Sequence, residues 1–356
     1  MKNLYKGISF SLLALASGLV GCKNGDISFD DYEGGISVYF PYQFPTRTLV
    51  MGSDTYNTDL DNAHKCLIST TMGGSYTGKD ITVTVAEDAS LLDHIYFKGG
   101  DKIEALPSTH YTIPSMVMNY NGSMKGAVEV TFTDAFFNDP KAVAGAYVIP
   151  LVIQSQTGAA RVLTGTYDTE VYSTAPQRTN SEAWKTLPMD YTLFRVNYIC
   201  KYEGYFMRRI TNFNGKDSIH VVMLEHESPV AVGDYYFQQG DAAIRSNYIR
   251  NANEPIVGTK TINLNKASYN AEVGDKTYAL VLDFSNGTIT APDGAAYTVT
   301  DGKCEYKDLS EKKAWGNKDR DGMYLEYTVD GISVKETLVL QRRGVTNNPY
   351  EIEYRQ

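Results

Sequence analysis

Histidines and carboxylates are the residues in this chain that could perform acid–base or metal chemistry. Of the five histidines, only His220 and His226 lie close together in sequence. In a strand they would share one face but stand too far apart to bind one metal ion directly. His226 lies between two glutamates, but the spacing is not that of a metalloprotease helix and the local pattern is that of a strand. The histidines therefore predict no metal centre.

Catalytic motifs are also missing. The sequence contains neither a Gly-x-Ser-x-Gly nucleophile elbow nor a glycine-rich phosphate-binding loop. A glycosidase needs two carboxylates a few ångströms apart across a sugar. Among 42 acidic residues such a pair arises by chance, so the count gives no support for that activity. We therefore predict a protein that is not an enzyme and that carries no cofactor.

A segment with alternating oxygen ligands is the one candidate for a cation. Asn317, Asp319 and Asp321 match the opening of a calcium-binding loop, with glycine in the sixth position. The twelfth position is Thr328, where such a loop has a bidentate glutamate. Two basic residues also alternate with the acidic ones. A polar hairpin turn is the preferred interpretation, and calcium is the alternative.

Aromatic side chains are the candidates for sugar binding, because a flat ring matches the apolar face of a pyranose while polar neighbours bond its hydroxyls. Trp315 stands near Asn317 in a loop-like segment, either as a platform for a sugar or packed at the end of a barrel. Trp184 is expected to anchor the second domain, with ligand contact as the alternative. Tyr235 and Tyr236 are adjacent, so in a strand at most one of them points outward.

The N-terminal residues indicate export. Lys2 and Lys6 precede an apolar run over residues 8–20, which is too short to span a bilayer and is typical of a signal-peptide core. The run ends in Leu19-Val20-Gly21-Cys22, which resembles the lipobox of bacterial lipoproteins. The resemblance implies cleavage before Cys22 and lipidation of its thiol. Several acyl chains would anchor the protein stably, and we expect no other contact with the membrane.

Charge and the acidic start of the mature chain bear on location and partners. Acidic residues shortly after the lipidated cysteine resemble the surface-export signal of Bacteroidetes lipoproteins. The resemblance implies an outer-membrane lipoprotein displayed on the cell surface, with the periplasmic face as the alternative. A net charge of −9 argues against nucleic acids and anionic polymers as partners. The other cysteines, Cys66, Cys200 and Cys304, are widely spaced and are expected to be buried and free.

Strand patterns dominate the rest of the chain and predict an all-β protein with little helix. Residues 81–85 and 128–132 alternate as half-buried strands do. Residues 147–153 are apolar on both faces, with Pro150 favouring an edge or a bulge. Single helical turns are expected over 88–93 and 134–137. Asx-Gly pairs predict turns in the second half; they are Asn214-Gly215, Asn286-Gly287, Asp293-Gly294, Asp321-Gly322 and Asp330-Gly331.

The domain organisation follows from these patterns. We predict a signal peptide over 1–21 and a flexible tether over 22–35. An Ig-like β-sandwich over 36–172 is expected to follow. Residues 173–183 are polar and read as a linker. Residues 184–356 would then form an antiparallel β-barrel, a calycin- or lipocalin-like domain, or a second sandwich.

Both halves of the chain resemble known domains. Gly73-Gly74-Ser75-Tyr76 and the run 145–151 resemble the β-sandwich domain of unknown function that opens many Bacteroidetes surface lipoproteins. The runs 202–209 and 337–344 resemble the domain of unknown function that often completes them. The resemblance implies a role beside polysaccharide-utilisation machinery, as a glycan-binding accessory with an outer-membrane transporter as a further partner.

The predicted function is therefore non-catalytic binding of a polysaccharide or oligosaccharide at the cell surface, as an accessory to glycan uptake. Two alternatives stay open at this point. One is a structural or adhesive module that contacts other proteins. The other is a barrel that holds a lipid or another hydrophobic ligand in its interior.

Overall fold

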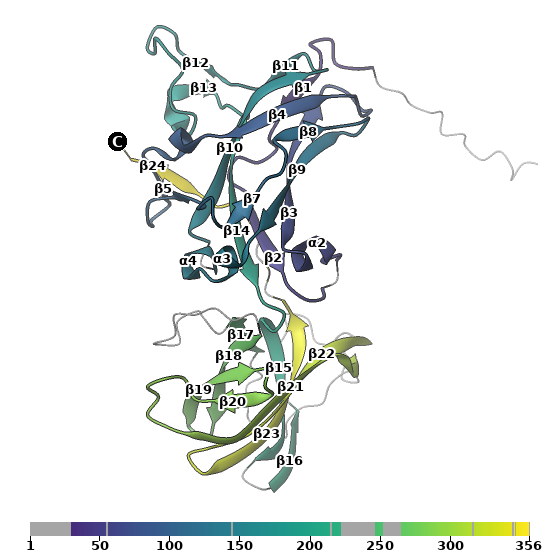
Figure 1. Ribbon diagram of the computed structural model, residues 1–356, viewed down its shortest axis with the longest axis vertical. Coiled ribbons are helices and arrows are strands. Elements are labelled where there is room, and N and C mark those ends of the chain that lie inside the picture. The colour runs from purple at the N-terminus through teal and green to yellow at the C-terminus, as the bar shows by residue number, and fades with distance from the viewer. Residues whose placement is uncertain are drawn as a thin grey trace, which may run out of the picture.

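The computed structural model describes residues 30–54, 56–143, 145–213, 216–221, 246–251, 265–314, 317–343, 345 and 347–355. Strands account for nearly all of the secondary structure, which confirms the all-β prediction. A sandwich and a barrel lie one beyond the other along the long axis of the molecule (Figure 1). None of the helices in the described ranges has the length and apolar character needed to cross a bilayer.

Two sheets pack together in the N-terminal domain, which confirms the predicted β-sandwich. The first has the order β11 (Arg161–Val162), β1 (Ser37–Tyr39), β3 (Lys65–Gly73), β9 (Lys125–Phe132) and β7 (Tyr111–Thr112). The second has the order β2 (Thr46–Val50), β14 (Tyr191–Ile199), β10 (Tyr147–Thr157), β4 (Thr82–Glu87) and β8 (Val117–Asn119), with β6 (Glu104–Ala105) beside β10. Alternate apolar residues of both sheets meet in one core, as in other sandwiches.

The second sheet is covered on its outer face as well, which explains why β10 is apolar on both sides. Ile149 and Leu151 of β10 belong to the core between the sheets. Val148 and Val152 face a second core with Leu91. This outer layer comprises η1 (Ala89–Leu92), β5 (Ile95–Phe97), Tyr350 and β24 (Ile352–Tyr354). The chain therefore returns to the sandwich after the barrel, and its C-terminal end lies beside the sandwich (Figure 1).

Pro150 lies in an inner strand of the sheet and pairs regularly with Leu193, so the prediction of an edge or a bulge at this residue was wrong. Along one side β10 pairs first with β6, at Tyr147 and Val148, and then with β4 from Leu151 onward. Pro150 falls between these two partners. A missing N–H costs little at such a junction, since no continuous ladder runs past it.

Short helical turns join the strands. They are α2 (Asp59–Asn62), α3 (Asp134–Phe137), α4 (Pro140–Val143) and η2 (Ser181–Ala183). The turns expected over 88–93 and 134–137 are confirmed by η1 and α3. Cys66, Cys200 and Cys304 are buried and free, as expected, and burial raises the pKa of each thiol to about 12. These thiols are therefore not reactive at neutral pH.

The second domain is an antiparallel barrel, one of the predicted alternatives. Its nine-stranded sheet has the order β16 (Lys216–Val221), β15 (Gly204–Phe213), β17 (Ser246–Asn251), β18 (Lys266–Val273), β19 (Lys276–Asp283), β20 (Thr288–Thr290), β21 (Val299–Ala314), β22 (Lys318–Val329) and β23 (Ile332–Arg342). β15 also pairs with β23, and this pairing closes the sheet on itself.

Two Asx-Gly pairs of the barrel, one at a turn and one inside a strand, show when this dipeptide predicts a turn correctly. Asp330 and Gly331 both have positive φ, at 48° and 76°, and join β22 to β23 in a two-residue hairpin, as predicted. The turn predicted at Asp321-Gly322 is wrong, because both residues lie inside β22. Asp321 is buried there and accepts hydrogen bonds from the Tyr306 hydroxyl and the Leu309 amide. A buried and fully bonded carboxylate stabilises the strand where an exposed one would favour a turn.

The predicted domain boundaries need correction. β13 (Trp184–Thr186) pairs with β12 (Thr166–Tyr167), and β14 pairs with β10 and β2, so the sandwich extends through residue 199. The polar segment 173–183 is therefore not a linker between domains. Residues 30–35 of the predicted tether pack on the sandwich, where the Tyr32 amide donates to Gly74 and Lys79 forms an ion pair with Asp31. The rest of the tether and the signal peptide lie outside the described residues.

Arg343 holds the junction between the two domains. The chain crosses there twice, between β14 and β15 and again after β23. The Arg343 guanidinium is 4% exposed and donates to the carbonyl oxygens of Met51, Cys200 and Lys201. Its contacts thus tie the sandwich and both crossings together.

Candidate functional site

A groove lined by tyrosines runs along the first sheet of the sandwich. Residues 30–35 and the turn after β3 border it, and its volume is about 850 Å³. Tyr32 and Tyr76 line the groove with side chains that are 62% and 72% exposed, and Tyr39 of β1 lines it as well. We name these three residues, with Arg161, the tyrosine groove. Rings this exposed offer flat apolar surfaces to a ligand in water.

Local structure fixes the wall of the tyrosine groove. Gly74 has a φ of 95°, and a Cβ there would come within 2.8 Å of the Gly35 carbonyl oxygen. Glycine is therefore required where the segment 30–35 crosses the end of β3. The Lys79 ammonium, followed by the Ser75 hydroxyl, lowers the pKa of Asp31, so this carboxylate stays ionised and holds the crossing in place.

Polar groups complete the tyrosine groove. Arg161 of β11 donates from Nε to the Ser37 hydroxyl at 3.0 Å, which orients the guanidinium along the sheet. Asp30 and Ser75 line the same space. Aromatic faces with a guanidinium, a carboxylate and hydroxyls close by are the combination that binds sugars, since each ring buries C–H groups and the polar groups bond hydroxyls.

The sequence did not single out this groove. Gly73-Gly74-Ser75-Tyr76 attracted attention only as a family motif, and Tyr32 lay in the predicted tether. The large number of tyrosines, 27, was the available signal, but it does not say which of them are exposed. Only the packing of residues 30–35 against the turn after β3 brings Tyr32 and Tyr76 to one groove.

The predicted binding residues fall elsewhere. Trp315, Tyr235 and Tyr236 lie outside the described residues, as does Cys22. Asn317 is exposed, has a φ of 54° and precedes β22 at a hairpin. The structure does not bring it to the tyrosine groove.

Trp184 serves the sandwich, so its predicted role as an anchor of the second domain was wrong. It belongs to β13, packs edge-on against Tyr167 at 5.6 Å, and donates from Nε1 to the Gln177 carbonyl at 3.0 Å. The physical reason is that β13 pairs with β12, and β12 directly follows β11 of the sandwich in the chain. Trp184 also lines a cavity of about 260 Å³.

The calcium alternative at Asn317, Asp319 and Asp321 does not fit the structure. Asp319 forms an ion pair with Lys312 at 2.9 Å, and Asp321 is buried with both carboxylate oxygens accepting from protein donors. The segment continues as strand β22 instead of curling around a point. In the described part of the chain, no group of three or more acidic, histidine or cysteine side chains is arranged to hold a metal ion.

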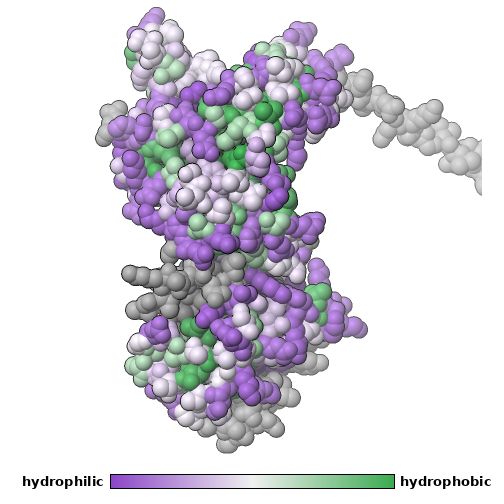
Figure 2. Space-filling model, viewed as in Figure 1, coloured by the Kyte–Doolittle hydropathy of each residue, from purple (hydrophilic) through white to green (hydrophobic). Residues whose placement is uncertain are grey.

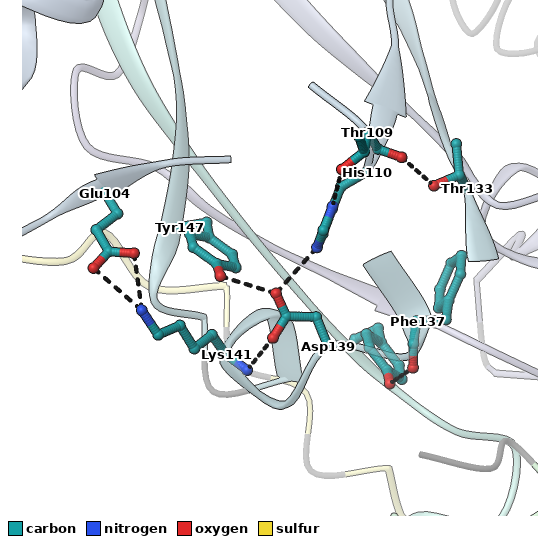
Figure 3. A network of polar contacts seen from close by, with 9 residues as sticks. Glu104, Thr109, His110, Thr133, Phe137, Asp139, Lys141 and Tyr147 are labelled. Atoms are coloured by element: carbon teal, nitrogen blue, oxygen red, sulfur yellow. Dashed lines mark hydrogen bonds and ion pairs between the residues drawn. The ribbon is translucent and has the colours of Figure 1, made fainter. Parts of the chain in front are cut away.

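A second polar network lies on the sandwich near α3 and α4 (Figure 3). His110 contacts the Thr109 hydroxyl through Nδ1 and Asp139 through Nε2, both at 3.0 Å. The order hydroxyl, imidazole, carboxylate is that of a hydrolase triad. Asp139, however, also accepts from the Tyr147 hydroxyl and the Lys141 amide, which hold it as part of the fold. Thr109 lines neither the tyrosine groove nor the two cavities beside Arg178.

Hydrogen bonds set the ionisation of this network. Burial opposes the charge on Asp139, but hydrogen bonds from Lys141, Tyr147 and His110 outweigh it and lower the pKa of the carboxyl. Burial and the same carboxylate raise the pKa of Tyr147 to about 12. The network therefore joins an ionised carboxylate to a neutral phenol at neutral pH, and the phenol is not poised to act as a base.

The barrel interior contains a buried ion pair. Arg208 of β15 and Glu336 of β23 are paired with side chains 11% and 0% exposed. The Tyr327 hydroxyl donates to Glu336 at 2.9 Å, and Arg208 also donates to the Glu272 carbonyl at 2.6 Å. A charged pair at this depth does not favour an apolar ligand such as a lipid acyl chain.

Comparison with known proteins adds two partial matches. Residues 30–160 match a family model described as an N-terminal domain, and residues 201–344 match the model of a domain of unknown function, DUF5627. Both ranges follow the sandwich and the barrel closely, although the sandwich also includes β14. None of the curated proteins searched matches the chain.

One solved structure resembles nearly the whole chain. A protein of unknown function from Bacteroides ovatus is 29% identical, with 92% of this chain and 100% of the other covered and a TM-score of 0.71. The two proteins share the same arrangement of sandwich and barrel. A multidomain protein from Bacteroides ovatus that includes DUF1735 is 12% identical over 85% of this chain and 92% of the other, with a TM-score of 0.36.

Proposed function

We propose that this chain is a non-catalytic lipoprotein of the outer cell surface that binds a polysaccharide in the tyrosine groove. The observation that carries the proposal is the exposure of Tyr32 and Tyr76 along one open groove of about 850 Å³. That volume lies within the usual range for ligand sites, and an open groove admits a chain where a closed pocket admits only its end. Arg161 and Asp30 would bond the sugar hydroxyls.

The surface character and the charge of the chain support a sugar in preference to an apolar partner. Hydrophobic residues on the visible face of the sandwich are interrupted by hydrophilic ones (Figure 2). Large protein-binding patches are more continuous than this. The acidic net charge of −9 also favours a neutral glycan over an anionic one.

Affinity electrophoresis against plant and host polysaccharides tests the groove. We expect Tyr32→Ala and Tyr76→Ala each to weaken retention on the recognised glycan about tenfold, since each removes one stacking surface. Tyr42→Ala is the matched control, because Tyr42 is 63% exposed and lies outside the groove. If the wild-type protein migrates freely on every glycan, or if the three variants behave alike, the proposal is wrong.

Anchoring needs its own test. Cys22→Ser should release the protein from the membrane fraction of the native host while leaving glycan retention by the purified protein unchanged. Protease treatment of intact cells distinguishes the outer surface from the periplasmic face, since only a surface-exposed sandwich is cleaved. Retention of Cys22→Ser in the membrane would contradict the lipid anchor without affecting the groove.

A further inference from the structure

Two neighbouring cavities lie on the side of the sandwich formed by residues 164–191. The first, of about 260 Å³, is lined by Tyr167, Pro176 and Trp184. The second, of about 310 Å³, is lined by Phe44, Tyr191 and Tyr350. Arg178 lines both cavities, so they meet at its side chain. Neither cavity includes a residue of the tyrosine groove.

A buried carboxylate fixes Arg178 between the cavities. Its Nε donates to both oxygens of Asp190, at 3.1 and 3.0 Å, and its Nη2 donates to one of them at 3.0 Å. Asp190 is 2% exposed and Arg178 37%, so the pair is anchored at the carboxylate and open at the guanidinium. No hydrogen bond within the described ranges uses Nη1. Two N–H donors are therefore held in a fixed position.

The aromatic walls are held just as firmly. Trp184 is fixed by its bond to the Gln177 carbonyl and by the edge of Tyr167. In the other cavity Phe44 contacts Tyr191 and Tyr350 edge-on, at 6.2 and 5.8 Å. Rigid aromatic walls lose little entropy when a ligand binds, which favours recognition.

A buried hydroxyl in the second cavity has no hydrogen-bond partner among the described residues. Thr179 lines this cavity and is 4% exposed, and its Oγ1 has no hydrogen-bond partner among the described residues. Leaving a buried hydroxyl unbonded costs about 1–3 kcal/mol. A ligand hydroxyl that reached Thr179 would remove that cost.

Charge defines what these cavities would accept. Asp190 neutralises Arg178, and Glu351 at the second cavity is paired with Lys98. The site is therefore neutral overall, with fixed donors and flat apolar walls. We infer that Trp184, Arg178 and Thr179 form a second carbohydrate site, for a neutral disaccharide unit with one ring in each cavity and a hydroxyl on Arg178 Nη1. Only the ligand class rests on the proposed function; the site is separate from the tyrosine groove.

Tryptophan fluorescence tests this site directly. The chain has two tryptophans, so Trp315→Phe leaves Trp184 as the single reporter. In that background we expect one member of a panel of neutral disaccharides, such as cellobiose, xylobiose and mannobiose, to change the Trp184 emission in a saturable way. Arg178→Lys keeps the charge but loses the fork that Asp190 holds, and should weaken binding at least tenfold.

Two further variants separate a binding role from a structural one. Thr179→Val keeps the shape and removes the unbonded hydroxyl, so it should leave the melting temperature unchanged or raised while weakening binding several-fold. Tyr32→Ala should leave the Trp184 response unchanged. If Trp184 responds to no disaccharide, or if Arg178→Lys binds as tightly as its parent, the second site is wrong. A Trp184 response without polysaccharide retention would overturn the tyrosine groove and leave this site standing.

Discussion

Two arginine–carboxylate pairs of the sandwich and one such pair of the barrel place their charges at different depths. In the sandwich, Asp61 and Asp190 are 1% and 2% exposed, but the arginines that they bind, Arg47 and Arg178, are 28% and 37% exposed. In the barrel, the side chains of the Arg208–Glu336 pair are 11% and 0% exposed. These two sandwich pairs thus orient cations at the rim of the domain, while the Arg208–Glu336 pair lies in the interior of the barrel.

This difference separates recognition from support. A guanidinium that is held from behind and open in front can still bond a ligand. A pair that is almost completely enclosed influences the stability and specificity of the fold instead. The cavities and exposed tyrosines that we assign to binding also lie on the sandwich.

Breaking the barrel pair should have the largest effect. Glu336→Leu leaves the buried Arg208 without its carboxylate, and we expect a loss of about 3–5 kcal/mol in the free energy of unfolding. The double variant Arg208→Met/Glu336→Leu should regain most of that loss, because an apolar pair of similar size has no charge to bury. Urea unfolding monitored by circular dichroism measures both. Equal losses of unfolding free energy in the single and double variants would show that the unpaired charge of Arg208 is not the cause of the loss.

Loosening the junction should have a smaller effect. Arg343→Lys cannot reach all three carbonyl oxygens of Met51, Cys200 and Lys201, and we expect a cost of about 2–3 kcal/mol. The sandwich and barrel should then unfold in two separate calorimetric transitions. Arg355→Lys, at an exposed pair with Glu353, is the control and should leave the free energy of unfolding nearly unchanged. A single unshifted transition in Arg343→Lys would mean that the domains are coupled by other contacts.

The polar network near α3 should contribute least. Because the pKa of Asp139 is lowered on folding, the unfolded chain binds its proton more readily. The stability gained is complete above the unfolded pKa of about 3.9 and is lost as the pH falls through the folded value. Asp139→Asn should cost about 1 kcal/mol at neutral pH and flatten this acid-side decline. The free energy of unfolding, measured from pH 7 down to pH 2.5 with the exposed Asp134→Asn as control, tests this prediction. If the free energy of Asp139→Asn declines with falling pH as steeply as that of the wild type, the prediction is wrong.

Local signals in the sequence predicted local structure well. Asp330-Gly331 gave the β22–β23 hairpin because both positions need positive φ, and nothing distant competes there. The same dipeptide type failed at Asp321, where Tyr306, 15 residues earlier, supplies a buried bond. Pro150 was placed at an edge because its strand partners were unknown. In both wrong predictions, a contact with another strand determines the structure. The residues next to each position in sequence do not indicate that contact.

The candidate sites were harder to predict for the same reason. Trp184 was recognised as a candidate, but the residues that give it a context, Tyr167 and Arg178, act through the pairing of β12 with β13 and the bond to Asp190. The tyrosine groove depends on a segment that composition marks as a tether. Sequence can indicate which residue types bind sugars, but exposure and neighbours are set by tertiary packing.

The return of the chain to the sandwich has a consequence for how the molecule folds. Tyr350 belongs to the outer core of the sandwich, yet about 150 residues separate it from the end of β14. When the barrel forms, Tyr205 and Arg342 become direct strand partners. The barrel then acts as a loop of about a dozen residues, and closing the shorter loop costs about 2 kcal/mol less in chain entropy. We therefore expect folding of the barrel to bring the tail to the sandwich, so that Tyr350 and β24 complete the outer layer last.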